Sequence, residues 1–251
     1  MRQKIIAGNW KMHGCQAANT DLLAILKEGM ANRAEVQCIV FPPYVYLSQV
    51  AQILKGSMIA YGGQDVSANE PGAHTGEVAA QMLLDIGCRY TLVGHSERRA
   101  QHHENNTLVA LKFAQAKQKG LQPILCVGET LEQHQAAQTE MVINAQIEAI
   151  LSLEAGVSGL REAVIAYEPV WAIGTGLSAT PQQAQAVHSM IRKKIAEHDN
   201  DIAANLSILY GGSVKASNAQ ALFTMADVDG GLVGGASLDG EEFLRIIECI
   251  N

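Results

Sequence analysis

Short apolar runs alternate with amphipathic stretches along the whole chain. The amphipathic stretches carry apolar residues at helical spacing, as Leu22, Ile25, Leu26 and Met30 show, whereas the short runs are typical of buried strands. We therefore expect eight strands, at residues 4–9, 36–41, 58–62, 90–93, 121–127, 163–167, 207–210 and 231–233. A helix should follow each strand, at residues 17–30, 44–54, 77–86, 104–119, 131–151, 181–198, 216–225 and 241–250.

This alternation predicts an α/β protein with a parallel sheet. Eight strand–helix units within 251 residues suit a closed (β/α)₈ barrel, with eight parallel strands surrounded by helices in a single domain spanning residues 1–251. An open, doubly wound sheet is the alternative. The barrel is favoured because no Gly-x-Gly-x-x-Gly follows the first strand, while polar or glycine-rich motifs follow nearly every strand and would gather at one mouth.

The stretch from Ala163 to Pro181 has the features of a functional site. Glu168 stands at the tip of its strand, and Pro169 biases Glu168 towards extended backbone. Thr180 and Gln183 form a predicted capping box for the following helix, with Pro181 at its first position. The connection is longer than usual and could close as a lid, with hinges at its ends. Its residues are Pro169, Val170, Trp171, Ala172, Ile173, Gly174, Thr175, Gly176, Leu177, Ser178 and Ala179. The alternative is a solvated glutamate in an ordinary connection.

Charge and cysteine content narrow the classes of partner. A net charge of −7 argues against nucleic acid or an anionic membrane as the main partner, although a local field could still attract a small anion. Five cysteines without a C-x-x-C pair predict reduced thiols rather than disulfides or a zinc site. No stretch is long enough to span a membrane, and the first residues lack the apolar region of a leader, so we expect a cytoplasmic protein.

Several polar or glycine-rich groups fall at predicted strand ends. They are Asn9, Lys11, His95, Glu168, Gly212-Ser213 and Gly234-Gly235. Singly, each has an ordinary explanation, such as a surface lysine, a core histidine or a turn glycine. Together they supply a carboxylate base, an imidazole, a cation and an amide. They also supply two glycine-rich loops after strands seven and eight, where barrels commonly bind phosphate. The set suits proton chemistry on a small phosphorylated molecule.

Five motifs then resemble those of the triosephosphate isomerase family, in the family order and across the whole chain. They are Gly8-Asn-Trp-Lys-Met12, Gly94-His-Ser-Glu-Arg-Arg99, Ala166-Tyr-Glu-Pro-Val-Trp-Ala-Ile-Gly-Thr-Gly176, Tyr210-Gly-Gly-Ser-Val214 and Leu232-Val-Gly-Gly-Ala-Ser-Leu238. The resemblance implies a TIM barrel enzyme of glycolysis and gluconeogenesis. This enzyme would interconvert dihydroxyacetone phosphate and D-glyceraldehyde 3-phosphate through an enediol(ate), with no cofactor and no metal.

The resemblance also implies roles for individual residues. Glu168 would move the proton between the two carbons, and His95 would be a neutral donor to the substrate oxygens, its pKa depressed by a helix start. Lys11 would supply positive charge and Asn9 would hold an oxygen. The role of Glu97, near Lys11 in the family, is left open.

Phosphate would be held by backbone N–H groups of Gly174, Ser213, Gly234 and Gly235, beside Lys11 and Asn9. Gly174 would arrive only when the lid closes. In the family, Trp171, Glu129 and Tyr210 are associated with the open and closed lid positions.

The loop Gly72-Ala-His-Thr-Gly-Glu77 resembles one that inserts into a neighbouring subunit, with Thr75 reaching the partner's site. It predicts a homodimer, whereas the residues alone would suggest an ordinary surface loop.

The chain departs from the family pattern at His13, His74, Leu177-Ser178-Ala179 and Gly231. We expect Gly231 to remove packing at the eighth strand, and from these departures we hypothesise a less rigid, less heat-stable family member. The remaining histidines are expected to be solvated: His102, His103, His134, His188 and His198.

Two other functions stay open at this point. An aldolase-like barrel usually needs a Schiff-base lysine inside the barrel, and Lys11 is the only motif-linked candidate at the mouth. A barrel kept as a binding or scaffold protein should have lost a proton-transferring residue, but Asn9, Lys11, His95 and Glu168 are all present.

Overall fold

Eight parallel strands close into a barrel in the computed structural model, which describes residues 2–173 and 178–250. Neighbouring strands pair in chain order, and β8 pairs back onto β1. The strands are β1 Lys4–Asn9, β2 Val36–Phe41, β3 Ala60–Gly63, β4 Tyr90–Val93, β5 Gln122–Val127, β6 Val164–Tyr167, β7 Ser207–Tyr210 and β8 Gly230–Val233. The predicted (β/α)₈ barrel is confirmed and the open sheet is excluded.

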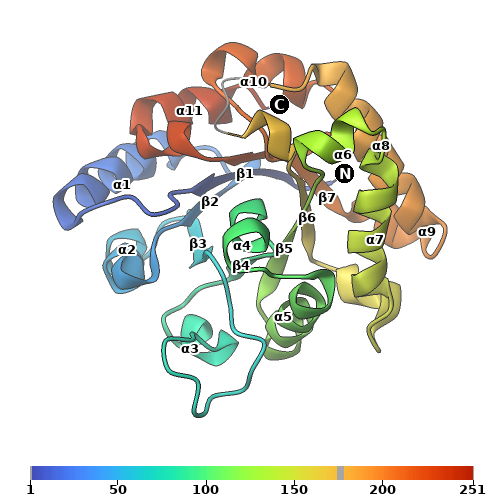
Figure 1. Cartoon of the computed structure of the whole chain (residues 1–251). Helices are drawn as coiled ribbons and strands as arrows, with labels where there is room; N and C mark the ends of the chain where they lie inside the picture. The colour runs from blue at the N-terminus through green and yellow to red at the C-terminus, as the bar shows by residue number, and fades with distance from the viewer. Residues whose placement is uncertain (1, 174–177, 251) are drawn as a thin grey trace.

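Helices surround the strands on the outside (Figure 1). They are α1 Gln16–Met30, α2 Leu47–Leu54, α3 Ala80–Asp85, α4 Ser96–Gln101, α5 Asn106–Lys119, α6 Leu131–Gln135, α7 Thr139–Leu151, α8 Pro181–Ala196, α9 Asn200–Asn205, α10 Ala216–Phe223 and α11 Gly240–Glu248. Short 3₁₀ turns lie at η1 Tyr44–Tyr46, η2 Gly156–Leu160, η3 Val170–Ala172 and η4 Gly235–Leu238. Within the described ranges, no helix is long and apolar enough to cross a membrane.

Both faces of each strand are buried, which explains why the strands are continuous apolar runs. In β1, Ile5 and Ala7 belong to the cluster that fills the barrel, whereas Ile6 belongs to the layer between strands and helices. Successive side chains of a strand point to opposite faces, so both layers draw on the same short segment.

Several helix boundaries follow the predicted signals. Thr180 and Gln183 form the capping box of α8, Pro181 opens the helix, and Gly120 ends α5 in the left-handed region at φ 98°. The expected loss of packing at Gly231 is wrong, because a Cβ there would lie 3.2 Å from Phe223 Cζ. The Phe223 ring already occupies that space.

Other helices differ from the prediction. The helix expected over 131–151 is broken between α6 and α7, where Ala137 has φ 56° and Gln138 N–H bonds to Gln133 O at 2.9 Å. This is a left-handed helix end made without glycine, so no residue type announces it. The short helix α9 was also missed, although Asp199 Oδ1 caps it by accepting from Asp201 N and Ile202 N.

Candidate active site

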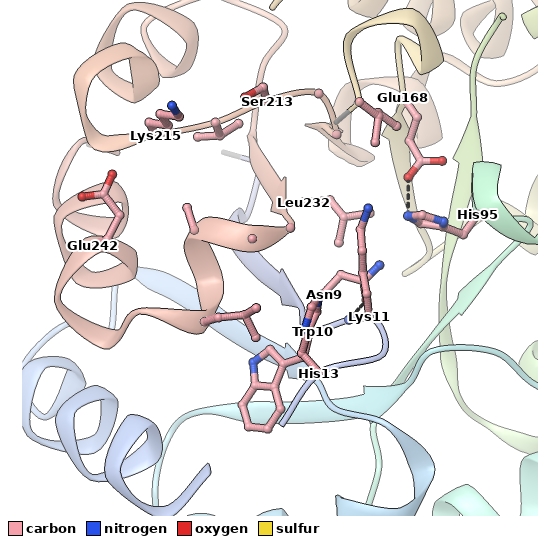
Figure 2. Close-up of a pocket in the computed structure, with 18 residues that line it drawn as sticks. Asn9, Trp10, Lys11, His13, His95, Glu168, Ser213, Lys215, Leu232 and Glu242 are labelled. Atoms are coloured by element: carbon pink, nitrogen blue, oxygen red, sulfur yellow. Dashed lines mark hydrogen bonds and ion pairs between the residues drawn. The ribbon is translucent and has the colours of Figure 1, made fainter. Parts of the chain in front are cut away.

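The carboxyl ends of the strands surround a cavity of about 570 Å³. Every candidate catalytic or phosphate-binding residue within the described ranges lines it: Asn9, Lys11, His95, Glu168, Ser213, Gly234 and Gly235. Figure 2 shows Glu168 and His95 pointing towards each other, with Lys11 extending into the same space. Gly174 and the lid residues 175–177 lie outside the described residues.

Glu168 is a buried carboxylate, with 2% of its surface exposed, so the solvated alternative is wrong. Its Oε2 accepts from Ser96 N at 2.8 Å, and its Oε1 lies 3.0 Å from His95 Nε2. Burial raises the pKa of the Glu168 carboxyl, but His95 and the Ser96 amide outweigh burial, and the net shift is below the ordinary value. The carboxylate is therefore ionised at neutral pH, as a general base requires.

The backbone of Glu168 is held as closely as its side chain. Its N–H donates to Val127 O at 2.7 Å, at the end of β5. A Cβ at Gly128 would lie only 1.7 Å from Glu168 O, so a glycine is needed for the two strand ends to approach. Ser96 and Gly128 were both missed as functional residues. The sequence signals were that Ser96 lies within the motif 94–99 and that Gly128 directly follows β5.

His95 precedes α4 and is presented by it. Its Nδ1 accepts from Glu97 N at 3.2 Å. A ring nitrogen that accepts has no proton, so the neutral ring carries its proton on Nε2 and donates to Glu168. Burial lowers the pKa of the imidazole, but the adjacent Glu168 carboxylate raises it more, so the expected net depression of the pKa is wrong for this arrangement.

Lys11 has an unusual backbone, with φ 51° in the left-handed region. Its N–H donates to Asn9 Oδ1 at 3.0 Å, and Gln64 Nε2 donates to Lys11 O at 2.8 Å. Its ammonium lies 2.5 Å from Glu97 Oε1. This strained turn costs roughly 1–2 kcal/mol, and it carries the ammonium from the end of β1 to the cavity. Glu97, whose role was left open, is the ion-pair partner of Lys11.

The two glycine-rich loops face the cavity with little side chain in the way. A Cβ at Gly235 would have no atom within 4 Å, so this backbone lies open. By contrast, a Cβ at Gly212 would lie 2.2 Å from the Tyr210 hydroxyl, and one at Gly211 would lie 2.9 Å from Glu168 Cγ. Exposed backbone amides in such loops suit an anion.

The two ends of the lid are attached to the barrel. At the first end, Trp171 Nε1 donates to Glu129 Oε1 at 2.9 Å, and Tyr167 OH donates to the same oxygen at 3.1 Å. At the other end, Ala179 N donates to the Tyr210 hydroxyl at 3.1 Å. The residues associated with the lid from sequence therefore contact it directly, whereas Tyr167 was missed.

The remaining histidines do not share one environment. His102, His103 and His198 are exposed, as expected. The prediction for His188 is wrong: it is fully buried, its Nδ1 lies 3.1 Å from Asp227 O, and burial lowers its pKa to about 4. His134 is half-buried against Trp171. In the part of the chain that the structure describes, no cluster of His, Cys, Asp or Glu could hold a metal.

The loop between β3 and α3 extends away from the barrel (Figure 1). Its tip, including His74 and Thr75, is exposed. Its root is fixed by Asp65, which pairs with Lys112 at 2.7 Å and with Arg98 at 2.9 Å.

Comparison with known proteins agrees with the geometry of the mouth. The family model described as triosephosphate isomerase matches residues 4–250. The triosephosphate isomerase of Nitrosomonas eutropha is 54% identical over 98% of this chain and 97% of its own length. That of Xanthomonas campestris pv. campestris strain 8004 is 56% identical over the same shares, and that of Dechloromonas aromatica is 53% identical over the full length of both chains. This chain therefore belongs to the triosephosphate isomerase family.

Proposed function

We propose that this chain interconverts dihydroxyacetone phosphate and D-glyceraldehyde 3-phosphate through an enediol(ate), as an enzyme of glycolysis and gluconeogenesis in the cytoplasm. Residues 1–251 act as one catalytic domain. Family membership supports the reaction. The observation that carries the residue assignments is the ionised, buried Glu168 facing the Nε2–H of His95 at the wall of one cavity.

Glu168 is the base. Its carboxylate must first leave Ser96 N and His95 Nε2, both of which it contacts, and turn towards the substrate. It then removes a proton from the carbon beside the carbonyl and returns it to the neighbouring carbon. One group performs both transfers, so these steps use no cofactor.

His95 serves the oxygens. When Glu168 turns away, the contact that raises the pKa of His95 is lost, whereas burial and the Glu97 amide at Nδ1 remain. Both favour the neutral ring, because burial disfavours charge and the amide needs a lone pair. The Nε2–H can then donate to the carbonyl oxygen and exchange protons between the two oxygens of the enediolate.

Lys11 and Asn9 assist at the same mouth. The Lys11 ammonium stabilises the negative charge that develops on the substrate, and the Asn9 amide positions an oxygen. The ion pair between Lys11 and Glu97 at 2.5 Å argues against a Schiff-base role, because an ion-paired ammonium is a poor nucleophile.

Phosphate binding completes the site. Backbone N–H groups of Ser213, Gly234 and Gly235 hold the phosphate, and Gly174 joins them when the lid closes. Closure excludes water, which suppresses the loss of phosphate from the enediolate.

The protein acts as a homodimer through the loop of residues 72–77, with Thr75 entering the partner's mouth. The exposed tip of this loop and its firmly paired root support an inserted element. Sedimentation analysis should give twice the chain mass of 26.8 kDa, and a monomer at micromolar concentration would contradict this arrangement.

A coupled assay of D-glyceraldehyde 3-phosphate conversion tests the function. The wild type should turn over rapidly, and Glu168→Gln should lose roughly 10²–10⁴-fold in kcat. Glu132→Gln, which changes an exposed carboxylate on α6, is the matched control. A folded wild type without turnover would refute the reaction, and a fully active Glu168→Gln would refute the base.

A further inference from the structure

His134 lies against the first end of the lid, on an element to which the mechanism above gives no role. Its ring stacks on Trp171, with ring centroids 4.6 Å apart and an angle of 26° between the planes. Its Nδ1 lies 3.2 Å from Glu129 Oε1, the oxygen that also accepts from Trp171 Nε1. One imidazole therefore contacts both partners of the bond that attaches the lid.

The short helix α6 gives this imidazole a defined position. Thr130 and Gln133 form a complete capping box at its start. His134 N–H donates to Thr130 O at 2.9 Å, and the left-handed Ala137 ends the helix a few residues later. A five-residue helix has little stability alone, so these caps are what hold His134 over Trp171.

The contact with His134 also bears on the Glu129 carboxylate. It is fully buried, and its Oε2 has no hydrogen-bond partner in the part of the chain described. A buried carboxylate is stable only when donors surround it. Oε1 lies within reach of three donors: Tyr167 OH, Trp171 Nε1 and, when it carries a proton, His134 Nδ1.

We propose that His134 is a positioning residue for the lid: its ring covers Trp171 and its Nδ1–H donates to Glu129, so that Trp171 is held in the orientation from which the lid closes over the substrate phosphate. The proposal rests on the proposed function, because it concerns the lid of that site. His134 is not among the residues that line the mouth cavity. Within the described residues, it is not a partner in the contact between Glu168 and His95.

The fluorescence of Trp171 reports the contact. The chain has two tryptophans, and Trp10 is 1% exposed, so acrylamide quenches mainly the fluorescence of Trp171. In His134→Ala the quenching constant should rise about twofold, because one face of the Trp171 ring loses its cover. His134→Phe keeps a ring but no donor and should stay near the wild-type quenching value. His198→Ala, at an exposed histidine just beyond the end of α8, should not change it.

Kinetics separate positioning from general damage. His134→Ala should lower kcat/KM for D-glyceraldehyde 3-phosphate about threefold to tenfold, the factor that a stacked, hydrogen-bonded ring supports. In the same variant, kcat/KM for D-glyceraldehyde, which has no phosphate for the lid to cover, should stay unchanged. An equal fall for both substrates, or unchanged quenching and kinetics in His134→Ala, would overturn the proposal. Failure of the proposed function would appear separately, as a wild type that turns over neither substrate.

Discussion

Glu168 and Glu129 are both buried carboxylates near the ends of neighbouring strands, yet their surroundings differ. Glu168 is held by two contacts, one to each oxygen, and both donors belong to the start of α4. Glu129 makes three contacts through one oxygen, and its other oxygen has no partner among the residues that the structure describes. In the proposed function the first carboxylate leaves its partners for a substrate, whereas the second stays between the barrel and the lid. Burial alone does not distinguish the two carboxylates; the contacts that each one makes do.

The largest expected difference is in turnover. Glu168→Gln should reduce kcat by roughly 10²–10⁴-fold, while its melting temperature moves only a few degrees, because glutamine can still accept from one of the two donors. A coupled assay and a thermal melt on the same sample measure both. A large fall in stability together with activity would show that Glu168 mainly holds the fold together rather than acting as the base.

Gly128 tests whether the backbone of Glu168 must be held so closely. Gly128→Ala places a Cβ where only 1.7 Å separates it from Glu168 O, so the strand ends must move apart. We expect a loss of about 1–3 kcal/mol in the free energy of unfolding and of about 10²-fold in kcat, from the displaced base. Gly159→Ala, where a Cβ meets atoms only at 3.5 Å or beyond, is the control.

Two buried histidines near these carboxylates extend the comparison. His95 contacts Glu168 directly and its pKa is raised, whereas His188 packs edge-on against Tyr167, the partner of Glu129, and its pKa falls to about 4. Between pH 6.5 and pH 4 the unfolded chain binds a proton at position 188 that the folded chain does not. Stability should therefore fall as pH drops through this window, by about 3 kcal/mol.

His188→Gln isolates that contribution. Glutamine does not titrate, so the free energy of unfolding, measured by urea at several pH values, should decline less steeply below pH 6.5 than in the wild type. His198→Gln should keep the wild-type slope, since His198 is exposed. Parallel curves for the wild type and His188→Gln would mean that His188 is not buried in its neutral form in solution.

The smallest expected effect is at Glu129. In Glu129→Gln the amide oxygen can take the place of Oε1 and the NH₂ group that of the unpartnered Oε2. The free energy of unfolding should change by no more than about 1 kcal/mol. The value of kcat/KM should fall by less than about tenfold, because the lid is attached more weakly. A loss as large as that of Glu168→Gln would end the distinction between the two carboxylates.

The sequence was sufficient for the barrel and for most of the described mouth. Apolar runs buried on both faces, helix caps such as Thr180 and polar groups at strand ends are local patterns, so they can be read without coordinates. The helix break at Ala137 was missed because its left-handed residue is not a glycine.

What the sequence by itself determined was the alternation of strands and helices, the order of the motifs and the chemical types at the mouth. Only the tertiary structure decided the state of each group. The opposite pKa shifts of His95 and His188, the need for glycine at Gly128 and the stacking of His134 on Trp171 all depend on residues distant in the chain. Electrostatic and packing energies act over a few ångströms in space, and closing the barrel is what brings those residues within that range.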